Sequence, residues 1–324
     1  MRIDPAIARL TDDPAPLAGA GEAIRAWRAS QAVAPVLAEL ECYGRDAPFA
    51  QCATLAALMT HEGGGTFARS VGTFAPAVLR KAELAALPWR HFSNGVLHSV
   101  TLAAYGRASL SLALIDGAAW QSARDPAAPA RVAFQPGELH AFVVAGRADA
   151  RILRNPELAD EAGAIASRAL ELEPGVAYAL DGTREALALD SIAGHLLTLR
   201  LYRAGDGTVP ARQYDLASGA LVHQAASDQR DSRAELAMAL LRAMERSDAA
   251  PAIAVLARGG TPAARWQALR ECLALDSGVG FRSLLEVAAN PGDPLAAPAA
   301  ALAERLAAAH PALAGIREAA LCPA

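Results

Sequence analysis

Lysine, aromatic side chains, cysteine and long apolar runs are all scarce in this chain of 324 residues. Its 30 basic side chains, nearly all arginine with Lys81 the exception, face 34 acidic ones, and aromatic residues make up only 5%. Nucleic-acid binding requires clustered basic residues, and single-strand binding also requires aromatic rings on which bases stack. We therefore expect no nucleic-acid partner. The abundance of arginine and alanine indicates a bacterial, GC-rich genome.

The spacing of the cysteines and the length of the apolar runs argue against further classes of protein. The four cysteines are far apart and form no C-x-x-C pair, which argues against a zinc knuckle or a disulfide framework and fits a reducing cytosol; they are Cys42, Cys52, Cys272 and Cys322. The N-terminus has no apolar signal region, and no apolar run approaches the roughly 18–20 residues of a membrane span. We expect a cytoplasmic protein without a membrane partner.

The hydrophobic fraction of 53% and the charged fraction of 20% are those of a globular chain. Residues 1–87 predict an N-terminal helical segment. Apolar residues recur at helical spacing from Glu22 to Glu41, where Pro35 leaves one broken helix or two short helices open. A further helix is expected after Pro48 and should end at Gly63–Gly65, and another is expected over Pro76–Leu87.

Residues 88–226 change character and predict β structure. Short runs with period-two alternation, such as Leu97–Tyr105 and Leu196–Tyr202, are separated by turn residues such as Asp116-Gly117. Many short strands at close spacing predict an antiparallel β barrel or sandwich. A helical insert is expected around Glu157–Leu170.

Residues 227–324 predict an α-helical domain. Ser232–Glu235 has the form of a capping box, and Thr261-Pro262 opens a later helix. Helix pairs of about 30 residues resemble a short HEAT-type solenoid, and a plain five-helix bundle fits the pattern equally well. The predicted fold class is therefore α+β and multi-domain, with the β barrel or sandwich flanked by N-terminal and C-terminal helices.

Two sequence segments in the β region each place a Pro-Gly turn before a strand: Phe134–His140 and Leu172–Tyr178. They resemble the turn that introduces strands in the cupin superfamily, and Gly137–His140 resembles the Gly-x-x-His unit of the second cupin motif. The resemblance covers the middle third of the chain and implies a cupin-like barrel. The first cupin motif has a His-x-His pair followed by Glu, all metal ligands, whereas this sequence has His98 alone, with Val100 in the second position.

Three histidines share strand parity with apolar neighbours: His98 with Val100 and Leu102, His140 with Phe142, and His195 with Leu197. On inward faces of a barrel, three neutral imidazoles could bind a divalent metal such as iron or zinc and leave a position for water or substrate. The alternative is that each is a core histidine hydrogen-bonded to backbone or water. Both interpretations remain open.

No complete catalytic constellation occurs in the sequence. The first functional hypothesis is therefore a binding protein that uses a β cavity and a helical surface for a small molecule, peptide or protein partner. The alternative is a metal-dependent cupin-type enzyme, an oxygenase or isomerase, with His98, His140 and His195 as ligands. An incompletely closed sheet could also pair across a two-fold axis and form a homodimer.

Overall fold

The computed structural model describes residues 15–80, 87, 89–125, 128–155, 165–313 and 315–316. Its internal contacts divide the chain into two compact units. The first comprises Met1–Ala204 with Tyr214–Ala220, and the second comprises Gly205–Gln213 with Leu221–Ala324. The first unit combines helices with antiparallel strands and the second is mainly helical, so the α+β class expected from the sequence is confirmed.

The first unit opens with helices whose bounds are α2 Ala15–Arg28, α3 Ala34–Gly44, the 3-10 turn η1 Phe49–Gln51, α4 Ala53–Leu58 and α5 His61–Leu79. The stretch around Pro35 forms two helices, because this proline lies in the first turn of α3, where its missing N–H leaves no hydrogen bond unmade. Pro76 does not open the helix expected over Pro76–Leu87, because it lies inside α5, and residues 81–86 lie outside the described residues.

The glycine run Gly63–Gly65 does not end a helix, contrary to the sequence-based expectation. It lies in the first turns of α5, where the side chain of the N-cap residue Thr60 accepts a hydrogen bond from the Gly63 N–H at 3.2 Å. A Cβ on Gly64 would lie 2.5 Å from the Leu58 carbonyl oxygen and 2.5 Å from the Phe142 ring. The close approach of α5 to the sheet therefore requires glycine at this position.

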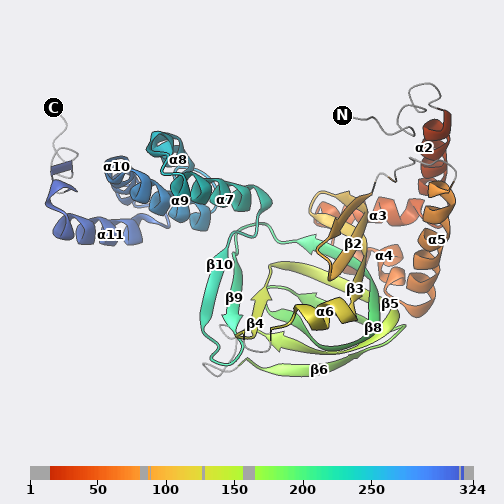
Figure 1. Ribbon diagram of the computed structural model, residues 1–324. Coiled ribbons are helices and arrows are strands. Elements are labelled where there is room, and N and C mark those ends of the chain that lie inside the picture. Colours follow the sequence, from red (N-terminus) through yellow and green to blue (C-terminus); the bar gives the residue numbers. More distant parts are fainter. Residues whose placement is uncertain are drawn as a thin grey trace, which may run out of the picture. The chain divides into compact units, whose positions relative to one another are not determined.

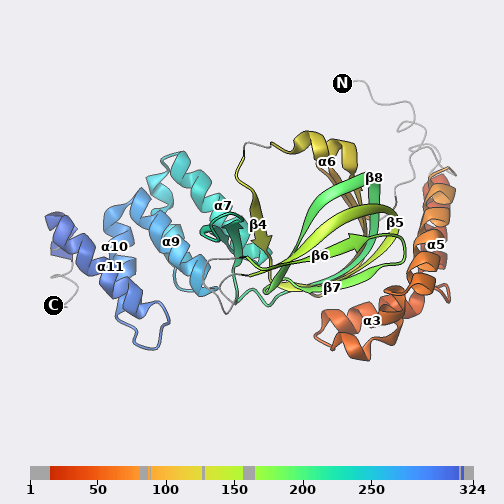
Figure 2. The same ribbon diagram turned by 90° about the horizontal axis from the view of Figure 1, so that it is seen from below.

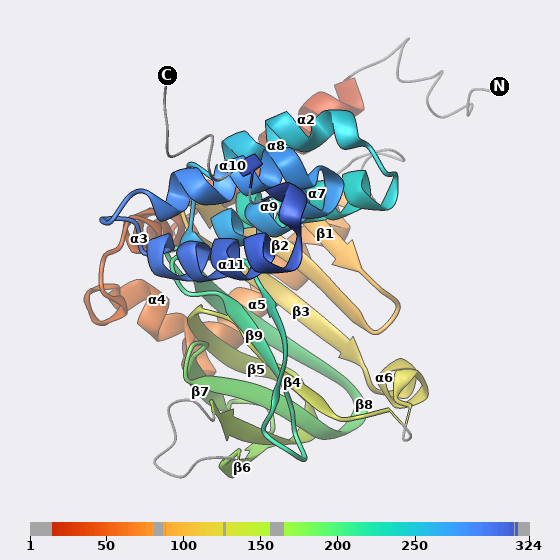
Figure 3. The same ribbon diagram turned by 90° about the vertical axis from the view of Figure 1, so that its left-hand side faces the viewer.

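Among the described residues, the main sheet is antiparallel and has seven strands, in the order β1-β2-β3-β8-β5-β6, with β7 also paired to β5 (Figure 1; β7 is labelled in Figure 2 and β1 in Figure 3). Their bounds are β1 Arg90–Ser93, β2 Leu97–Tyr105, β3 Ala108–Asp116, β5 Gly137–Arg154, β6 Ser167–Leu172, β7 Ala177–Asp181 and β8 Glu185–Ala204. The helix α6 Gly117–Ala123 follows β3 directly (Figure 3). β6 begins at Ser167, so the end of the helical insert expected over Glu157–Leu170 is a strand, and residues 156–164 lie outside the described residues.

A second sheet has the order β10-β9-β4, with bounds β4 Arg131–Phe134, β9 Ala211–Asp215 and β10 Leu221–Ala225. Within the first unit, Val132 and Phe134 of β4 pack with Leu153, Ala186 and Tyr214 in one buried cluster. β4 thereby lies against the long strands β5 and β8, which curve together with β6 and β7 (Figure 2). The antiparallel β structure expected from the sequence is confirmed in the described residues, whereas the expected domain bounds of 88–226 stay a prediction.

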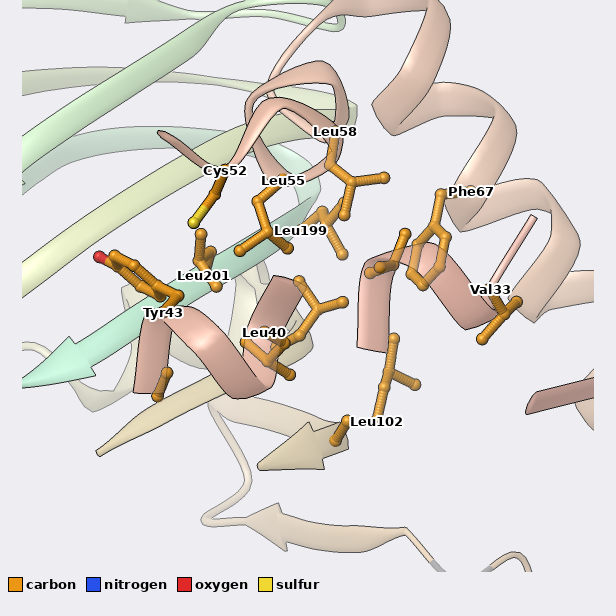
Figure 4. Packing of buried hydrophobic residues seen from close by; sticks show 14 of the residues in the cluster. Val33, Leu40, Tyr43, Cys52, Leu55, Leu58, Phe67, Leu102, Leu199 and Leu201 are labelled. Carbon is orange, nitrogen blue, oxygen red and sulfur yellow. The ribbon is translucent and has the colours of Figure 1, made fainter. Parts of the chain in front are cut away.

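The largest core of the first unit lies between the N-terminal helices and the sheet (Figure 4). α3 packs on β2 and β3, and α5 packs on β5. The cluster contains Leu40 and Tyr43 from α3, Leu55 from α4, and Leu199 and Leu201 from β8, each fully buried. Apolar burial of this extent is the main force that holds a helical layer on a sheet. The N-terminal helices are therefore part of the same compact unit as the strands.

A polar network crosses the same interface. Arg203 of β8 donates to both carboxylate oxygens of Glu138, at 2.8 and 2.9 Å, and to the backbone carbonyls of Tyr43 and Ala47. The Tyr43 hydroxyl donates to Glu138 at 2.9 Å, and the guanidinium lies 4.2 Å from the Tyr43 ring centre. Burial opposes ionisation of Glu138, but the hydrogen bonds from Arg203 and Tyr43 outweigh it and hold the pKa of this carboxyl below its usual range.

The second unit contains α7 Gln229–Ala243, η3 Ser247–Ala249, α8 Ala250–Leu256, α9 Pro262–Leu275, α10 Ser277–Ala288 and α11 Ala296–Ala309. α9 packs against α7, α8 and α10, around a core that includes Leu269, Phe281 and Leu284. The helices expected over residues 227–324 are thus present. Whether their arrangement is HEAT-like stays a prediction.

The first cap of this unit differs from the one predicted. α7 begins one turn before Ser232, because the Asp228 side chain accepts hydrogen bonds from the Arg230 and Asp231 N–H groups at 2.7 and 3.1 Å. The Ser232 hydroxyl instead donates to the Ala226 carbonyl at 3.1 Å. The predicted Thr261 cap is confirmed, since its side chain accepts from the Ala264 N–H.

The different surroundings of Gly64 and Gly65 in α5 lead to a prediction that a matched pair of substitutions tests. Gly64→Ala should destabilise the protein by ~1–3 kcal/mol, because the added methyl overlaps the Leu58 carbonyl and the Phe142 ring. Gly65→Ala meets no atom within 4 Å and should stabilise it by about 0.5–1 kcal/mol through helix propensity. Urea denaturation of both variants measures the difference, and equal effects would contradict this account of the glycine run.

The Arg203 network generates a second prediction. Arg203→Met should cost roughly 2–3 kcal/mol of unfolding free energy, less than for a fully buried pair because Glu138 remains 46% exposed. Arg45→Met is the control, since it removes a solvent-exposed pair with Glu41 and should change the unfolding free energy by less than about 0.5 kcal/mol. Similar costs for the two arginines in denaturant melts would show that the network contributes no more than a surface pair.

Candidate functional site

His98 and His195 lie at the same end of the main sheet, on either side of β3. His195 is opposite Asp116 in the register of β3 and β8, with 3.8 Å between its Nδ1 and the Asp116 Oδ2. His98 Nδ1 lies 2.9 Å from the Ser93 hydroxyl oxygen. The Ala119 N–H holds the pKa of the Asp116 carboxyl below its usual range, and the nearby His195 and His98 lower it further. This cluster lies at the surface, where the His195 side chain is 61% exposed.

His140 lies elsewhere, beneath the N-terminal helices. It is opposite Leu201 in the register of β5 and β8, and its ring stacks on Phe49 with 3.7 Å between the ring centres. His195 is six positions from Leu201 along β8, a separation of ~20 Å at the rise of an extended strand. The structure therefore does not bring the three histidines together. Among the described residues no three His, Cys, Asp or Glu side chains are grouped so that they could hold a metal ion.

A cavity of ≈430 Å³ lies on the opposite face of the strands, entirely within the first unit. Its lining residues come from β3, β4, β5, β7 and β8 and from the turns next to them. Most of its wall is apolar, and it is lined by Ala113, Ile115, Ala133, Gln135, Gly137, Leu139, Tyr178, Leu180, Gly182, Glu185, Ala186, Leu187, Leu189, Leu196, Thr198, Arg200 and Tyr202. Cavities of this volume and composition are typical of small-molecule sites.

Some polar side chains of the lining already form hydrogen bonds within the described part of the protein, and others do not. The Tyr202 hydroxyl donates to the Pro136 carbonyl at 3.1 Å, and the Thr198 hydroxyl donates to the Ala113 carbonyl at 3.4 Å. Burial raises the pKa values of Tyr178 and Tyr202, and the positive charge of Arg200 acts in the opposite direction on both. Both phenols thus stay neutral at physiological pH and lie within the field of the Arg200 guanidinium.

The sequence predicted the strands and the turn that form this cavity, but not the polar side chain that distinguishes it. The predicted strand Leu196–Tyr202 is part of β8, and the predicted Pro136-Gly137 turn borders the cavity. Arg200 was not singled out as a site residue. The available signal was a charged side chain within the mainly apolar run 196–201 of β8, since a charge in such a run requires either a partner or a function.

The second unit has a separate hollow of ≈700 Å³. It is lined mainly by apolar side chains of α9 and α11 and by residues near the end of the described chain: Trp266, Arg270, Leu273, Ala274, Ser277, Leu302, Leu306, His310, Ala312 and Leu313. None of the described helices in either unit is long and apolar enough to cross a membrane. Of the four cysteines, Cys42, Cys52 and Cys272 are free thiols, and Cys322 lies outside the described residues.

No profile of a known protein family matches the sequence, and no curated protein is similar to it in sequence. Among solved structures, vicilin from hazelnut (Corylus avellana) has 16% identity and a TM-score of 0.27, over 38% of this chain and 33% of vicilin. Ectoine synthase from P. lautus has 14% identity and a TM-score of 0.23, over 35% of this chain and 67% of the synthase. A cupin superfamily protein from Desulfitobacterium hafniense has 14% identity and a TM-score of 0.23, over 35% of this chain and 83% of that protein.

The match to vicilin thus spans about a third of that protein's length. The cupin-like barrel predicted from the sequence stays a prediction. At these TM-scores the likeness carries no argument about function.

The position of His140 generates a prediction about pH. Burial lowers the pKa of His140 from the ordinary value of 6.5, and the charge of Arg203 acts in the same direction, while Glu138 opposes both. The folded state then binds this proton less readily than the unfolded state, so the protein should lose stability as the pH falls below about 6.5. His140→Phe, which keeps a ring against Phe49, should make the decline between pH 7 and 5 shallower.

Denaturant melts at a series of pH values test this, and NMR identifies the His140 ring signal by its loss in the variant. A His140 that titrates above 6.5, or a variant that keeps the full decline, would contradict the burial argument.

Proposed function

We propose that this protein is a binding protein and that the cavity of its β unit receives a small molecule. The observation that carries the proposal is the cavity itself, which is already formed within one compact unit and has mostly apolar walls with a few polar groups. Preformed hollows of this kind are the usual place for small ligands, because apolar contact provides affinity and a few polar groups fix orientation.

The lining supports binding over catalysis. Among the described residues, the lining contains no histidine or cysteine, and Glu185 is its single carboxylate. General acid–base chemistry requires a titratable group within hydrogen-bond reach of the reacting atom, and many catalytic sites combine two such groups. A metal-dependent oxygenase or isomerase would need His98, His140 and His195 to line one site, and none of the three lines this cavity.

A neutral apolar probe tests the proposal on the full chain. N-phenyl-1-naphthylamine fluoresces strongly in apolar surroundings and should bind with saturable, one-to-one stoichiometry. Ala133 lines the cavity from β4 and is solvent-exposed, so Ala133→Phe can narrow the cavity without disturbing a packed core. This substitution should weaken probe binding about tenfold or more, because the added ring occupies the space that the probe requires.

Ala169→Phe provides the control, because Ala169 is exposed on β6 and does not line the cavity. It should leave the probe affinity unchanged. If both variants bind the probe as the original protein does, or if the original protein does not bind it, the cavity is not the binding site and the proposal fails.

A further inference from the structure

Arg200 occupies the middle of the cavity wall. In the strand register it lies opposite Ser111 of β3 on one side and Ala141 of β5 on the other, and Ala141 is in turn opposite Tyr178 of β7. Arg200 and Tyr178 are thus in one row across the sheet, two strands and ~10 Å apart between their backbones. Both side chains line the cavity, with Thr198 and Tyr202 flanking Arg200 along β8. A group placed above Ala141 is within reach of both.

Neither of these two side chains is engaged by the protein. Within the described part of the chain, the Arg200 guanidinium makes no ion pair or hydrogen bond, and the Tyr178 hydroxyl makes no hydrogen bond. Glu185, the carboxylate of the lining, is fifteen positions away along β8 and forms no ion pair with Arg200. A guanidinium that has no ion-pair partner in the fold can pair with an anion that enters the same cavity.

We propose that the cavity selects a small monocarboxylate with an apolar body, whose carboxylate pairs with the Arg200 guanidinium and accepts a hydrogen bond from the Tyr178 hydroxyl. This ligand class rests on the proposed function, since it presupposes that the cavity binds a small molecule. The planar guanidinium offers two parallel N–H donors that match the two oxygens of a carboxylate. The leucine side chains of β5, β7 and β8 then enclose the apolar body.

The charge of the lining favours a carboxylate over a phosphate. Of the described lining residues, Arg200 is the single cation, and Glu185 brings a negative charge into the same wall. A phosphate group carries up to two negative charges and is usually held by several cations or by a ring of backbone N–H groups at a helix N-terminus. The lining provides neither, whereas one guanidinium and one phenol satisfy a monocarboxylate.

Competition against N-phenyl-1-naphthylamine tests the carboxylate ligand class separately from the proposed binding function. Octanoate, 1-octanol and octylamine have the same apolar chain and differ in the head group. Octanoate should displace the probe from the original protein with an affinity about tenfold or more above that of 1-octanol, and octylamine should be the weakest, because a charged hydrogen-bonded pair is worth at least one order of magnitude in affinity.

Arg200→Met keeps the length and apolar character of the arginine stem and removes the charge. It should reduce the preference for octanoate over 1-octanol to less than about twofold, and this ratio does not depend on the variant's own affinity for the probe. Tyr178→Phe should reduce octanoate affinity about threefold to tenfold, as expected for the loss of one hydrogen bond to a charged group. The matched control is Arg168→Met, an exposed arginine on β6 outside the lining, which should preserve the full preference.

The outcomes distinguish failure of the carboxylate inference from failure of the binding function. If the probe binds but octanoate is no better than 1-octanol, or if Arg200→Met keeps the preference, the carboxylate inference is overturned and the binding function stands. If neither the probe nor octanoate binds the original protein, both are overturned. Circular dichroism of each variant separates a lost preference from a lost fold.

Discussion

The pairing of β5 with β8 is the constraint on which the rest of the first unit depends. Successive side chains of a strand point to opposite faces, so this long pair has to satisfy two different surroundings at once. Leu199, Leu201 and Arg203 of β8 face the N-terminal helices, while Thr198, Arg200 and Tyr202 line the cavity. A shift of one residue in the register would exchange these two sets, and it would place leucines in the cavity and Arg200 against the helices.

Arg200 and Arg203 show what the two faces require. Arg203 is 13% exposed and is fully engaged, by the Glu138 carboxylate, by two backbone carbonyls of the helical layer and by the Tyr43 ring. Removing such a cation from water is compensated only when hydrogen bonds and an opposite charge replace the water. The network also fixes where α3 lies on the sheet, because apolar packing alone is not directional. Arg200 has none of these partners among the described residues, although it lies three positions away on the same strand.

Sequence patterns predicted the strands and helices well, because alternation and helical periodicity report how each element is buried. They did not predict which face of a strand meets which neighbour. Residues 141–145 of β5 are apolar on both faces, so alternation alone does not tell the two faces apart. The parity that grouped His140 with Phe142 predicted burial, but this face meets Phe49 of the helical layer and not the cavity. The helical conformation of Gly63–Gly65 depends on contacts with distant residues such as Phe142, which local sequence rules do not contain. The start of α7 depends on competition between Asp228 and Ser232 as caps, which local rules do not resolve either. The pairing of Asp116 with His195 joins residues far apart in the sequence, so no local motif announces it.

The same reasoning explains why Arg200 is the informative residue of the cavity. Apolar residues fill most positions around it, and a leucine or methionine there would complete the wall without the cost of desolvating a cation. On the proposed function, a carboxylate that enters the cavity gives Arg200 the partner that the fold does not provide. That ion pair would exist only in the bound state, so its net free energy, after both groups lose water, would contribute to affinity. Arg203, on the opposite face of the same strand, already has its partners within the fold.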